Sequence, residues 1–390
     1  MIRFACLADV HIGRRSTAAP EETALNAFGR VVDHTLEGRA DALLIAGDLF
    51  DSRAAQYPAR RELLKHLRRL HERNIPVLAV AGNHDPEALR DFHRSFPDLL
   101  QLLGDQAWEE TEIQGVRILG RSFEKSHAKN LLADFPVFHD SRPTLSLLHA
   151  DVDAASPYNP VRLDELRGRG VGAWVLGHVH LPRLWEDPCA AYIGSPQALD
   201  PGEPGPHGFR WLEFDQTRFT FSDLVPVSSV RYESLILTSE NGQSVEEVLE
   251  EALAKQDFGA AKLFLRLHLR IRDERPHIPE GPVTEETLTW EVLSTEDCPP
   301  VDLHAEAEQS DARGQAARLL LALEAGQSPA TEALIDQLLA DLDDRRAKLR
   351  IPPGEHFDLL RGSPETDREA AVRALRGNLA SVLTAGRPGL

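Results

Sequence analysis

Five short clusters of Asp, Asn and His residues stand out in the sequence, because each directly follows a run of apolar residues. The clearest run, Leu43-Leu44-Ile45-Ala46, stops at Gly47-Asp48. Short apolar runs bounded by Gly predict buried parallel strands, which end at the ligand-binding edge of an α/β sheet. We therefore expect five clusters to converge on one place: Asp9-Val10-His11, Asp48, Asn83-His84-Asp85, His149 and His178-Val179-His180.

The residue types in these clusters are typical of a site for hard divalent cations. Carboxylate, amide and imidazole ligands in octahedral geometry suit ions of the manganese type, whereas a structural zinc site prefers four Cys or His ligands. The expected ligands include no cysteine: Asp9, His11, Asp48, Asn83, His149, His178 and His180. This set is large enough for two ions, and Asp48 is the candidate for a carboxylate that bridges them.

Two such ions imply phosphoester hydrolysis. Ions about 3.5–4 Å apart can hold a bridging hydroxide and bind the nonbridging oxygens of a phosphate during in-line attack. Taken alone, each cluster has another interpretation, a cap or a turn with solvated Asp and His side chains. We favour the metal site because all five clusters directly follow apolar runs.

The elements that must position these clusters begin as alternating strands and helices. Strands are expected at residues 2–7, 41–45 and 77–81, with helices at 21–36 and 58–73, which predicts a β-α-β-α-β unit. Further strands are expected at 116–119, 144–148, 173–176 and 191–193, and a hairpin at 209–224. Together they predict a sheet-rich phosphoesterase domain over residues 1–225.

A smaller α+β unit is expected over residues 226–300 and a helical region over residues 301–390. The smaller unit has expected strands at 232–238, 262–272 and 287–293 and a helix at 245–255. In the strand 262–272, apolar residues alternate with Lys, Arg and His, which predicts one buried and one basic face. Beyond residue 300, Leu334, Leu338 and Leu342 form one stripe of an amphipathic helix.

The formal net charge of −19 argues against a strong intrinsic affinity for nucleic acid. Nucleic-acid-binding proteins usually carry a basic excess, although bound divalent cations would neutralise several carboxylates here. The three cysteines, Cys6, Cys189 and Cys298, are far apart and indicate neither a disulfide framework nor a zinc site. No apolar run reaches the length of a membrane span or a signal peptide, so we expect a cytoplasmic protein.

The ordered motifs D-x-H, G-D-x-x-D, G-N-H-D, H and G-H-x-H resemble those of the calcineurin-like metallophosphoesterase superfamily. Residues 7–13 and 46–51, and the later loop from Gly194 through Gly202-Glu203 to Phe209, are similar to the SbcD-like DNA-repair exonucleases, including the YhaO-like branch. The resemblance implies an α/β fold, a metallophosphoesterase β-sandwich flanked by helices, with a small α+β cap domain and a helical C-terminal tail.

The resemblance also implies how the ligands divide between two ions. One ion would take Asp9, His11, Asp48 and His180, and the other Asp48, Asn83, His149 and His178. His84 lies outside both sets and is the expected general acid for the departing alkoxide, a role worth typically 10²–10⁴-fold in rate. We expect Asp85 to hold the tautomer or the protonated state of His84, and Asp51 to orient a metal-ligating histidine. The alternative for His84 is simple packing of the turn.

Substrate contacts are expected from arginines near the metal loops and on the basic face of the strand 262–272. Arg binds phosphate oxygens in a bidentate manner, and the candidates are Arg14, Arg53, Arg266 and Arg270. The alternative is that these side chains form solvated faces paired with Glu and Asp.

We therefore expect a metal-dependent phosphodiesterase that acts as a DNA exonuclease or endonuclease in DNA repair, with two Mn²⁺ ions. DNA ends or single strands would be the substrate. The resemblance implies an SMC-like coiled-coil ATPase of the SbcC type as partner, docked on the leucine stripe of the tail, which could instead pack on the protein's own core. A homodimer is left open. The alternative function is a small-molecule or phosphoprotein phosphoesterase of the same superfamily.

Overall fold

The structure is a computed structural model that describes residues 1–21, 23–154, 156–259, 261–272 and 274–297, with residues 304, 307–308, 317–318 and 321. It divides into two compact units. The first contains Met1–Leu235, Gln256–Arg266 and Gly281–Glu291, and the second Ile236–Lys255, Leu267–Glu280 and the chain from Val292. The predicted domain boundaries at 225 and 300 stay a prediction. The expected helical region, with its leucine stripe, lies almost entirely outside the described residues.

The first unit is built on a seven-stranded sheet in the order β14-β13-β1-β2-β3-β4, with β15 paired to β13. Its parallel strands are β1 (Ile2–Leu7), β2 (Ala42–Ala46), β3 (Val77–Val80) and β4 (Gln101–Leu102). Helices α1 (Ala24–Glu37), α2 (Gln56–His71) and α3 (Pro86–Ser95) connect them. Antiparallel strands β13 (Gly208–Phe214), β14 (Phe219–Phe221) and β15 (Val225–Pro226) complete the sheet. The predicted β-α-β-α-β opening and the later hairpin are therefore confirmed.

A second, six-stranded sheet has the order β11-β12-β10-β7-β6-β5. Its central strands β6 (Val116–Arg121), β7 (Thr144–His149), β10 (Ala173–Gly177) and β12 (Ala190–Tyr192) are parallel. The edges, β5 (Glu109–Ile113) and β11 (Arg183–Trp185), are antiparallel. A short pair, β8 (Asp151–Val152) with β9 (Pro160–Val161), and the helix α4 (Leu163–Leu166) lie in the connection from β7 to β10.

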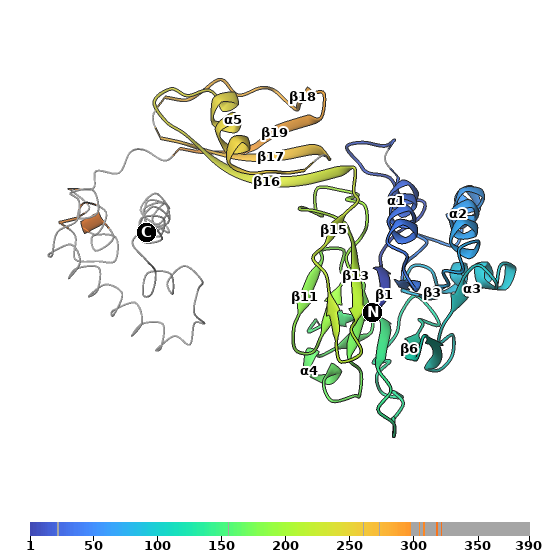
Figure 1. Ribbon diagram of the computed structural model, residues 1–390. Helices are drawn as coiled ribbons and strands as arrows, with labels where there is room; N and C mark the ends of the chain where they lie inside the picture. The colour runs from blue at the N-terminus through green and yellow to red at the C-terminus, as the bar shows by residue number, and fades with distance from the viewer. Residues whose placement is uncertain are drawn as a thin grey trace. The chain divides into compact units, whose positions relative to one another are not determined.

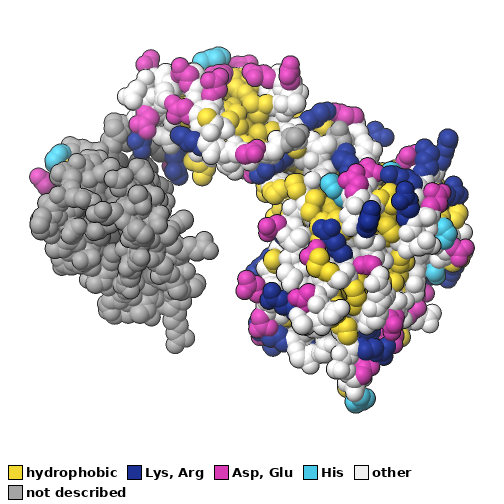
Figure 2. All heavy atoms as spheres, in the orientation of Figure 1, with side chains coloured by type: hydrophobic (Ala, Val, Ile, Leu, Met, Phe, Trp, Pro, Cys, Tyr) yellow, Lys and Arg dark blue, Asp and Glu magenta, His cyan; other side chains and the backbone are white. Residues whose placement is uncertain are grey.

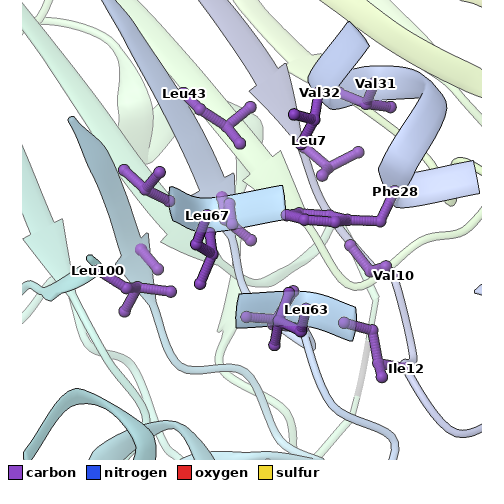
Figure 3. Close-up of a cluster of buried hydrophobic side chains, with 14 of the residues drawn as sticks. Leu7, Val10, Ile12, Phe28, Val31, Val32, Leu43, Leu63, Leu67 and Leu100 are labelled. Atoms are coloured by element: carbon purple, nitrogen blue, oxygen red, sulfur yellow. The ribbon is translucent and has the colours of Figure 1, made fainter. Parts of the chain in front are cut away.

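The two sheets pack face to face because strand residues alternate between two cores. In β2, Leu44 and Ala46 face a core shared with β7 and β10 of the second sheet. Leu43 and Ile45 face the helices instead. Figure 3 shows Phe28 of α1 and Leu67 of α2 in this helix-side core, and Figure 1 shows the three helices on the same side of the first sheet. The predicted α/β sandwich flanked by helices is confirmed.

The later part of the chain forms a four-stranded sheet in the order β16-β17-β19-β18. Its strands are β16 (Val230–Ser239), β17 (Lys262–Ile271), β18 (Val283–Glu285) and β19 (Leu288–Asp297), and its helix is α5 (Val245–Lys255). Along β17, buried and partly exposed residues alternate from Leu263 to Ile271, as the sequence predicts. Within the part of the chain that the structure describes, no helix has both the length and the apolar character needed to cross a membrane.

Two helices differ from the sequence-based expectation. Helix α2 begins at Gln56, two residues before Pro58, because a proline fits within the first helical turn, where N–H groups lack intrahelical partners. Helix α3 was not expected, although Asp85-Pro86 is a typical helix start with proline at the first helical position. This helix begins immediately after the Asn83-His84-Asp85 cluster, and Asp85 is its N-cap residue.

Candidate metal centre

All seven predicted ligands lie at or just beyond the ends of strands. Asp9 and His11 follow β1, Asp48 follows β2 and Asn83 follows β3 of the first sheet. His149 ends β7, and His178 and His180 follow β10 of the second sheet. Because the strands within each set are parallel, their carboxyl ends lie at one end of each sheet. Both layers of the sandwich therefore contribute to one cluster of side chains.

Several of these residues have a backbone conformation that L-amino acids rarely adopt. The φ angles of Asp9, His11, Asp48 and His178 are 50°, 51°, 51° and 106°. Such conformations cost about 1–3 kcal/mol each and concentrate at functional sites. Hydrogen bonds between the first two loops stabilise them, since Asp9 N donates to Gly47 O over 3.1 Å and His11 N to Asp48 O over 2.9 Å.

The first ligand group joins the loop after β1 to the loop after β10. The Nε2 atoms of His11 and His180 lie 3.0 Å apart, and Asp9 is near both, so that these three residues offer ligand atoms within 4.8 Å of one another. Asp48 Oδ2 lies 3.8 Å from His11 Nε2. Two ligands at right angles on an octahedral ion lie roughly 3 Å apart, which matches the spacing of the two imidazole nitrogens.

The second ligand group surrounds Asn83. Its Oδ1 lies 3.0 Å from His149 Nε2 and 3.2 Å from His178 Nδ1, and Asp48 Oδ2 lies 3.4 Å from His149 Nε2. The Nδ1–H of His149 donates to Ala46 O over 3.0 Å, which leaves Nε2 as an acceptor in the neutral ring. Two acceptors that face each other are unfavourable unless a cation lies between them, so this arrangement fits a bound metal ion.

Two glycines leave the room that these ligands need. A Cβ on Gly82 would lie 2.3 Å from Asp48 Oδ1, and a Cβ on Gly47 would lie 2.3 Å from His149 Nδ1. Gly47 also has a φ of +96°, which glycine adopts without strain. Any larger residue at either position would displace a predicted ligand.

The electrostatics of the cluster also favour a cation. Burial raises the pKa of Asp9 to about 7, and the negative charge of Asp48 adds to this effect. Burial likewise raises the pKa of Asp85, again with a contribution from Asp48. Burial lowers the pKa of His149 to about 4, so the ring is neutral and can bind a metal. The buried carboxylates are not neutralised by nearby positive charge, and the imidazole of His149 is neutral. This combination of donors fits hard divalent ions.

Further carboxylates lie near the second ring nitrogen of three predicted histidine ligands, the nitrogen that does not face the other ligands. Asp51 Oδ1 lies 3.4 Å from His11 Nδ1, Asp151 Oδ2 lies 3.6 Å from His178 Nε2, and Glu203 Oε1 lies 2.5 Å from His180 Nδ1. Asp51 thus lies where a residue that orients a ligand would be expected. Asp151 and Glu203 were not predicted. Asp151 follows the same apolar run as His149 and could have been found by that signal, whereas Glu203 belongs to a loop rich in Gly and Pro.

The exposed ring of His84 lies beside the cluster. Its Nδ1 contacts Asp51 O at 3.1 Å, and its centroid is 4.8 Å from that of His11. The carboxylate of Asp85 instead accepts from Gly82 N over 2.9 Å and from Phe50 N over 3.2 Å. The expectation that Asp85 holds the His84 ring is therefore corrected: the side chain turns toward buried backbone donors, and the Asp51 carbonyl contacts the ring.

The four arginines predicted to bind substrate all form ion pairs. On the face shown in Figure 2, Lys and Arg side chains are interspersed with Asp and Glu. The partners are Asp200 (3.3 Å) and Asp51 (4.0 Å) for Arg14, Glu87 and Asp91 for Arg53 (2.9 Å each), Glu291 for Arg266 (3.5 Å) and Glu296 for Arg270 (3.4 Å). Contact with a phosphate would require each arginine to exchange its carboxylate partner, and the role stays a prediction.

The segment around His127 is connected to the cluster through Tyr158. Tyr158 lies 5.3 Å from His178 by ring centroids, and the exposed ring of His127 stacks on Tyr158 at 5.4 Å. Among the described residues, the exposed Lys125 and Lys129 on either side of His127 form no ion pair. No sequence pattern singles out this segment, because its lysines are not part of a long basic run.

The two-layered fold agrees with that of a metal-dependent phosphoesterase. Residues 2–182 match the family model for calcineurin-like phosphoesterases, and the chain has a calcineurin-like metallophosphoesterase domain, a hydrolase domain whose family uses a dinuclear metal site. The predicted resemblance is therefore confirmed.

Relatives of this chain include proteins named for DNA repair. The DNA double-strand break repair protein Mre11 of Saccharolobus solfataricus is 28% identical over 213 residues, covering 51% of this chain and 55% of that protein. The uncharacterized metallophosphoesterase YhaO of Bacillus subtilis is 27% identical, covering 51% and 52%. Mre11 of Methanopyrus kandleri is 24% identical over 353 residues, covering 76% of both. The chain spans about half the length of the first two relatives.

Proposed function

We propose that this chain is a nuclease that hydrolyses phosphodiester bonds of DNA with two divalent ions, and that these ions are Mn²⁺. The observation that carries the proposal is the pair of ligand groups that share Asp48: His11 and His180 on one side, and Asn83 with His149 and His178 on the other. The carboxylate of Asp48 approaches both groups, at 3.8 Å from His11 Nε2 and 3.4 Å from His149 Nε2.

In the mechanism, Asp9, His11, Asp48 and His180 would hold one ion, and Asp48, Asn83, His149 and His178 the other. The ions would supply Lewis acidity and a nucleophile at neutral pH. Burial lowers the pKa values of His11, His149 and His178, which favours their neutral rings, and the hydrogen bond from His149 Nδ1–H to Ala46 O directs the free nitrogen of that ring inward.

His84 would give a proton to the leaving alkoxide. Its Nδ1 lies 3.1 Å from Asp51 O, and because a carbonyl only accepts, Nδ1 carries a hydrogen. In the doubly protonated ring, Nε2–H is then the group available to the leaving oxygen. The exposure of the ring leaves it accessible to a substrate.

The choice of DNA draws on two supports. The Mre11 relatives are named as DNA double-strand break repair proteins, and the segment around His127 offers the contacts that a strand needs. A base can stack on the aromatic rings of Tyr158 and His127, and Lys125 and Lys129 can contact phosphates. The net charge of −19 is consistent with a partner that supplies more of the DNA affinity, and we propose an SMC-like coiled-coil ATPase in that role.

The deciding experiment compares substrates at matched protein and Mn²⁺ concentrations. Labelled single-stranded and double-stranded DNA, bis-nitrophenyl phosphate and a phosphoserine peptide would be incubated with the full chain. We expect cleavage of DNA that exceeds cleavage of the peptide, and its loss in a chelator. Hydrolysis of the phosphopeptide or the small diester without any cleavage of DNA would favour the alternative, a small-molecule or phosphoprotein phosphoesterase.

A further inference from the structure

We propose that Glu203 is a positioning residue that holds His180 in the orientation needed to bind a metal ion. The inference rests on the metal site proposed above but not on DNA as the substrate. It concerns the loop 194–207, which is distant in sequence from every expected ligand except His178 and His180.

His180 needs such support because it lies beyond the end of β10, three residues after Gly177. Two contacts from the loop 194–207 hold it. Ser195 N donates to His180 O over 2.9 Å, and Glu203 Oε1 lies 2.5 Å from His180 Nδ1. Since an ionised carboxylate can only accept, Nδ1 carries the hydrogen. The Nε2 atom therefore points to the ligand cluster, 3.0 Å from His11 Nε2.

Glu203 is itself held firmly. Its side chain is buried, with 7% of the residue exposed, and Oε2 accepts from Leu199 N over 2.8 Å. The ring of His207 links both ends of the loop, because Nε2 lies 3.1 Å from Glu203 O and Nδ1 lies 2.8 Å from Ser195 Oγ and 3.0 Å from Ser195 O. Both oxygens of Glu203 are thus in use.

A purely structural role for Glu203 explains these contacts less well. The carboxylate adds a buried negative charge close to Asp9, which opposes the ionisation of that ligand. A neutral glutamine could accept the same hydrogen bond from His180 without this cost. A negative charge behind a metal-ligating imidazole is useful because it fixes the tautomer and raises the basicity of the ring.

The test measures metal binding in the full chain, independently of any substrate. Calorimetric titration with Mn²⁺ would compare wild type, Glu203→Gln and Glu203→Ala. We expect 10–100-fold weaker binding at one of two sites in Glu203→Ala, a smaller loss in Glu203→Gln, and little change at the other site. The matched control is Glu62→Gln, an exposed glutamate on α2 paired with Lys65, which should bind as wild type.

A second variant separates the two sites. Asp151→Asn, beside His178, should weaken the other ion. If a folded Glu203→Ala variant binds both ions as wild type, the positioning role is wrong. If no metal binds at all, nitrogen NMR of metal-free protein provides a second readout. It reports which ring nitrogen of His180 carries the hydrogen at a pH where the ring is neutral. A ring protonated at Nδ1 in wild type and not in Glu203→Ala would support the role, whereas identical spectra would overturn it.

Discussion

The backbone N–H of His84 donates a hydrogen bond of 2.9 Å to Oδ1 of Asp48. The proposed acid is therefore attached to the proposed bridging ligand through its main chain and not through its ring. Any substitution of His84 other than proline keeps this hydrogen bond, whereas substitution of Asp48 removes it. The two residues can thus be tested separately.

Asp48→Ala should lose metal and activity together, since Asp48 is the carboxylate common to both ligand groups. Atomic absorption of the purified protein should find fewer than two ions per chain, and hydrolysis should fall to background. Asp33→Ala is a suitable control, because Asp33 is exposed on α1 and pairs only with Arg69 among the contacts described. Two ions still bound to Asp48→Ala would contradict the assignment.

His84→Asn should keep both ions but hydrolyse DNA about 10²–10⁴-fold more slowly. The loss should be much smaller for bis-nitrophenyl phosphate, because nitrophenolate is a good leaving group and needs no proton. His71→Asn, at the exposed end of α2, is the control. Equal losses on the two substrates would exclude proton donation by His84.

The double variant Lys125→Ala/Lys129→Ala should bind DNA more weakly and with less dependence on salt. Each phosphate contact removed should lower the slope of log K against log salt by about 0.7–0.9. Tyr158→Leu should lose a stacking contact of about 1–3 kcal/mol per base while keeping that slope. Lys65→Ala is the control for the lysines. An unchanged salt dependence in the double variant would mean that DNA does not contact this segment.

The stability of the metal-free protein should fall as pH rises from about 6.5 to about 7. The folded-state pKa of Asp9, about 7, lies above its unfolded value near 3.9, so the folded protein retains a proton that the unfolded chain releases. Stability from this group is present below the unfolded pKa and declines up to the folded one, by about 1 kcal/mol per pH unit. Below about 6.5, buried histidines with lowered pKa values, such as His149, act in the opposite direction.

Urea denaturation of chelated protein at several pH values measures this slope. Asp9→Asn cannot titrate at this position and should show a smaller decline, and added Mn²⁺ should reduce the decline in wild type. If wild type and Asp9→Asn have the same slope, the raised pKa of Asp9 is wrong.

The sequence placed the predicted ligands at the ends of strands because they follow continuous apolar runs, and both features are local. Leu44 and Leu147 are recognisable as strand residues from their neighbours alone. Nothing local shows that β2 and β7 belong to different sheets that pack together, since this depends on which strands pair. The strand β5 (Glu109–Ile113) was missed for a related reason: it is a charged edge strand that lacks an apolar run.

Residues that act through other residues were harder to predict. Glu203 is 23 positions from His180 and meets it only because a Gly- and Pro-rich loop folds back. The arginines were predicted to bind substrate because a sequence shows a charged residue but not its ion-pair partner. Arg53 resembles a phosphate ligand until Glu87 and Asp91 are seen beside it. Long-range polar contacts of this kind are fixed by the folded loops.

The close approach of the two sheets at the site has a consequence for cooperativity. A Cβ on Gly177 would lie 2.0 Å from Ala46 O, and His149 of the second sheet donates to that same oxygen of the first. Ions held by ligands from both layers would act as non-covalent cross-links between them. Chelation should then speed amide hydrogen exchange at the carboxyl ends of β2 and β7 together, while α1 and α2 exchange as before, because local opening of either sheet would no longer require breaking the shared metal bonds.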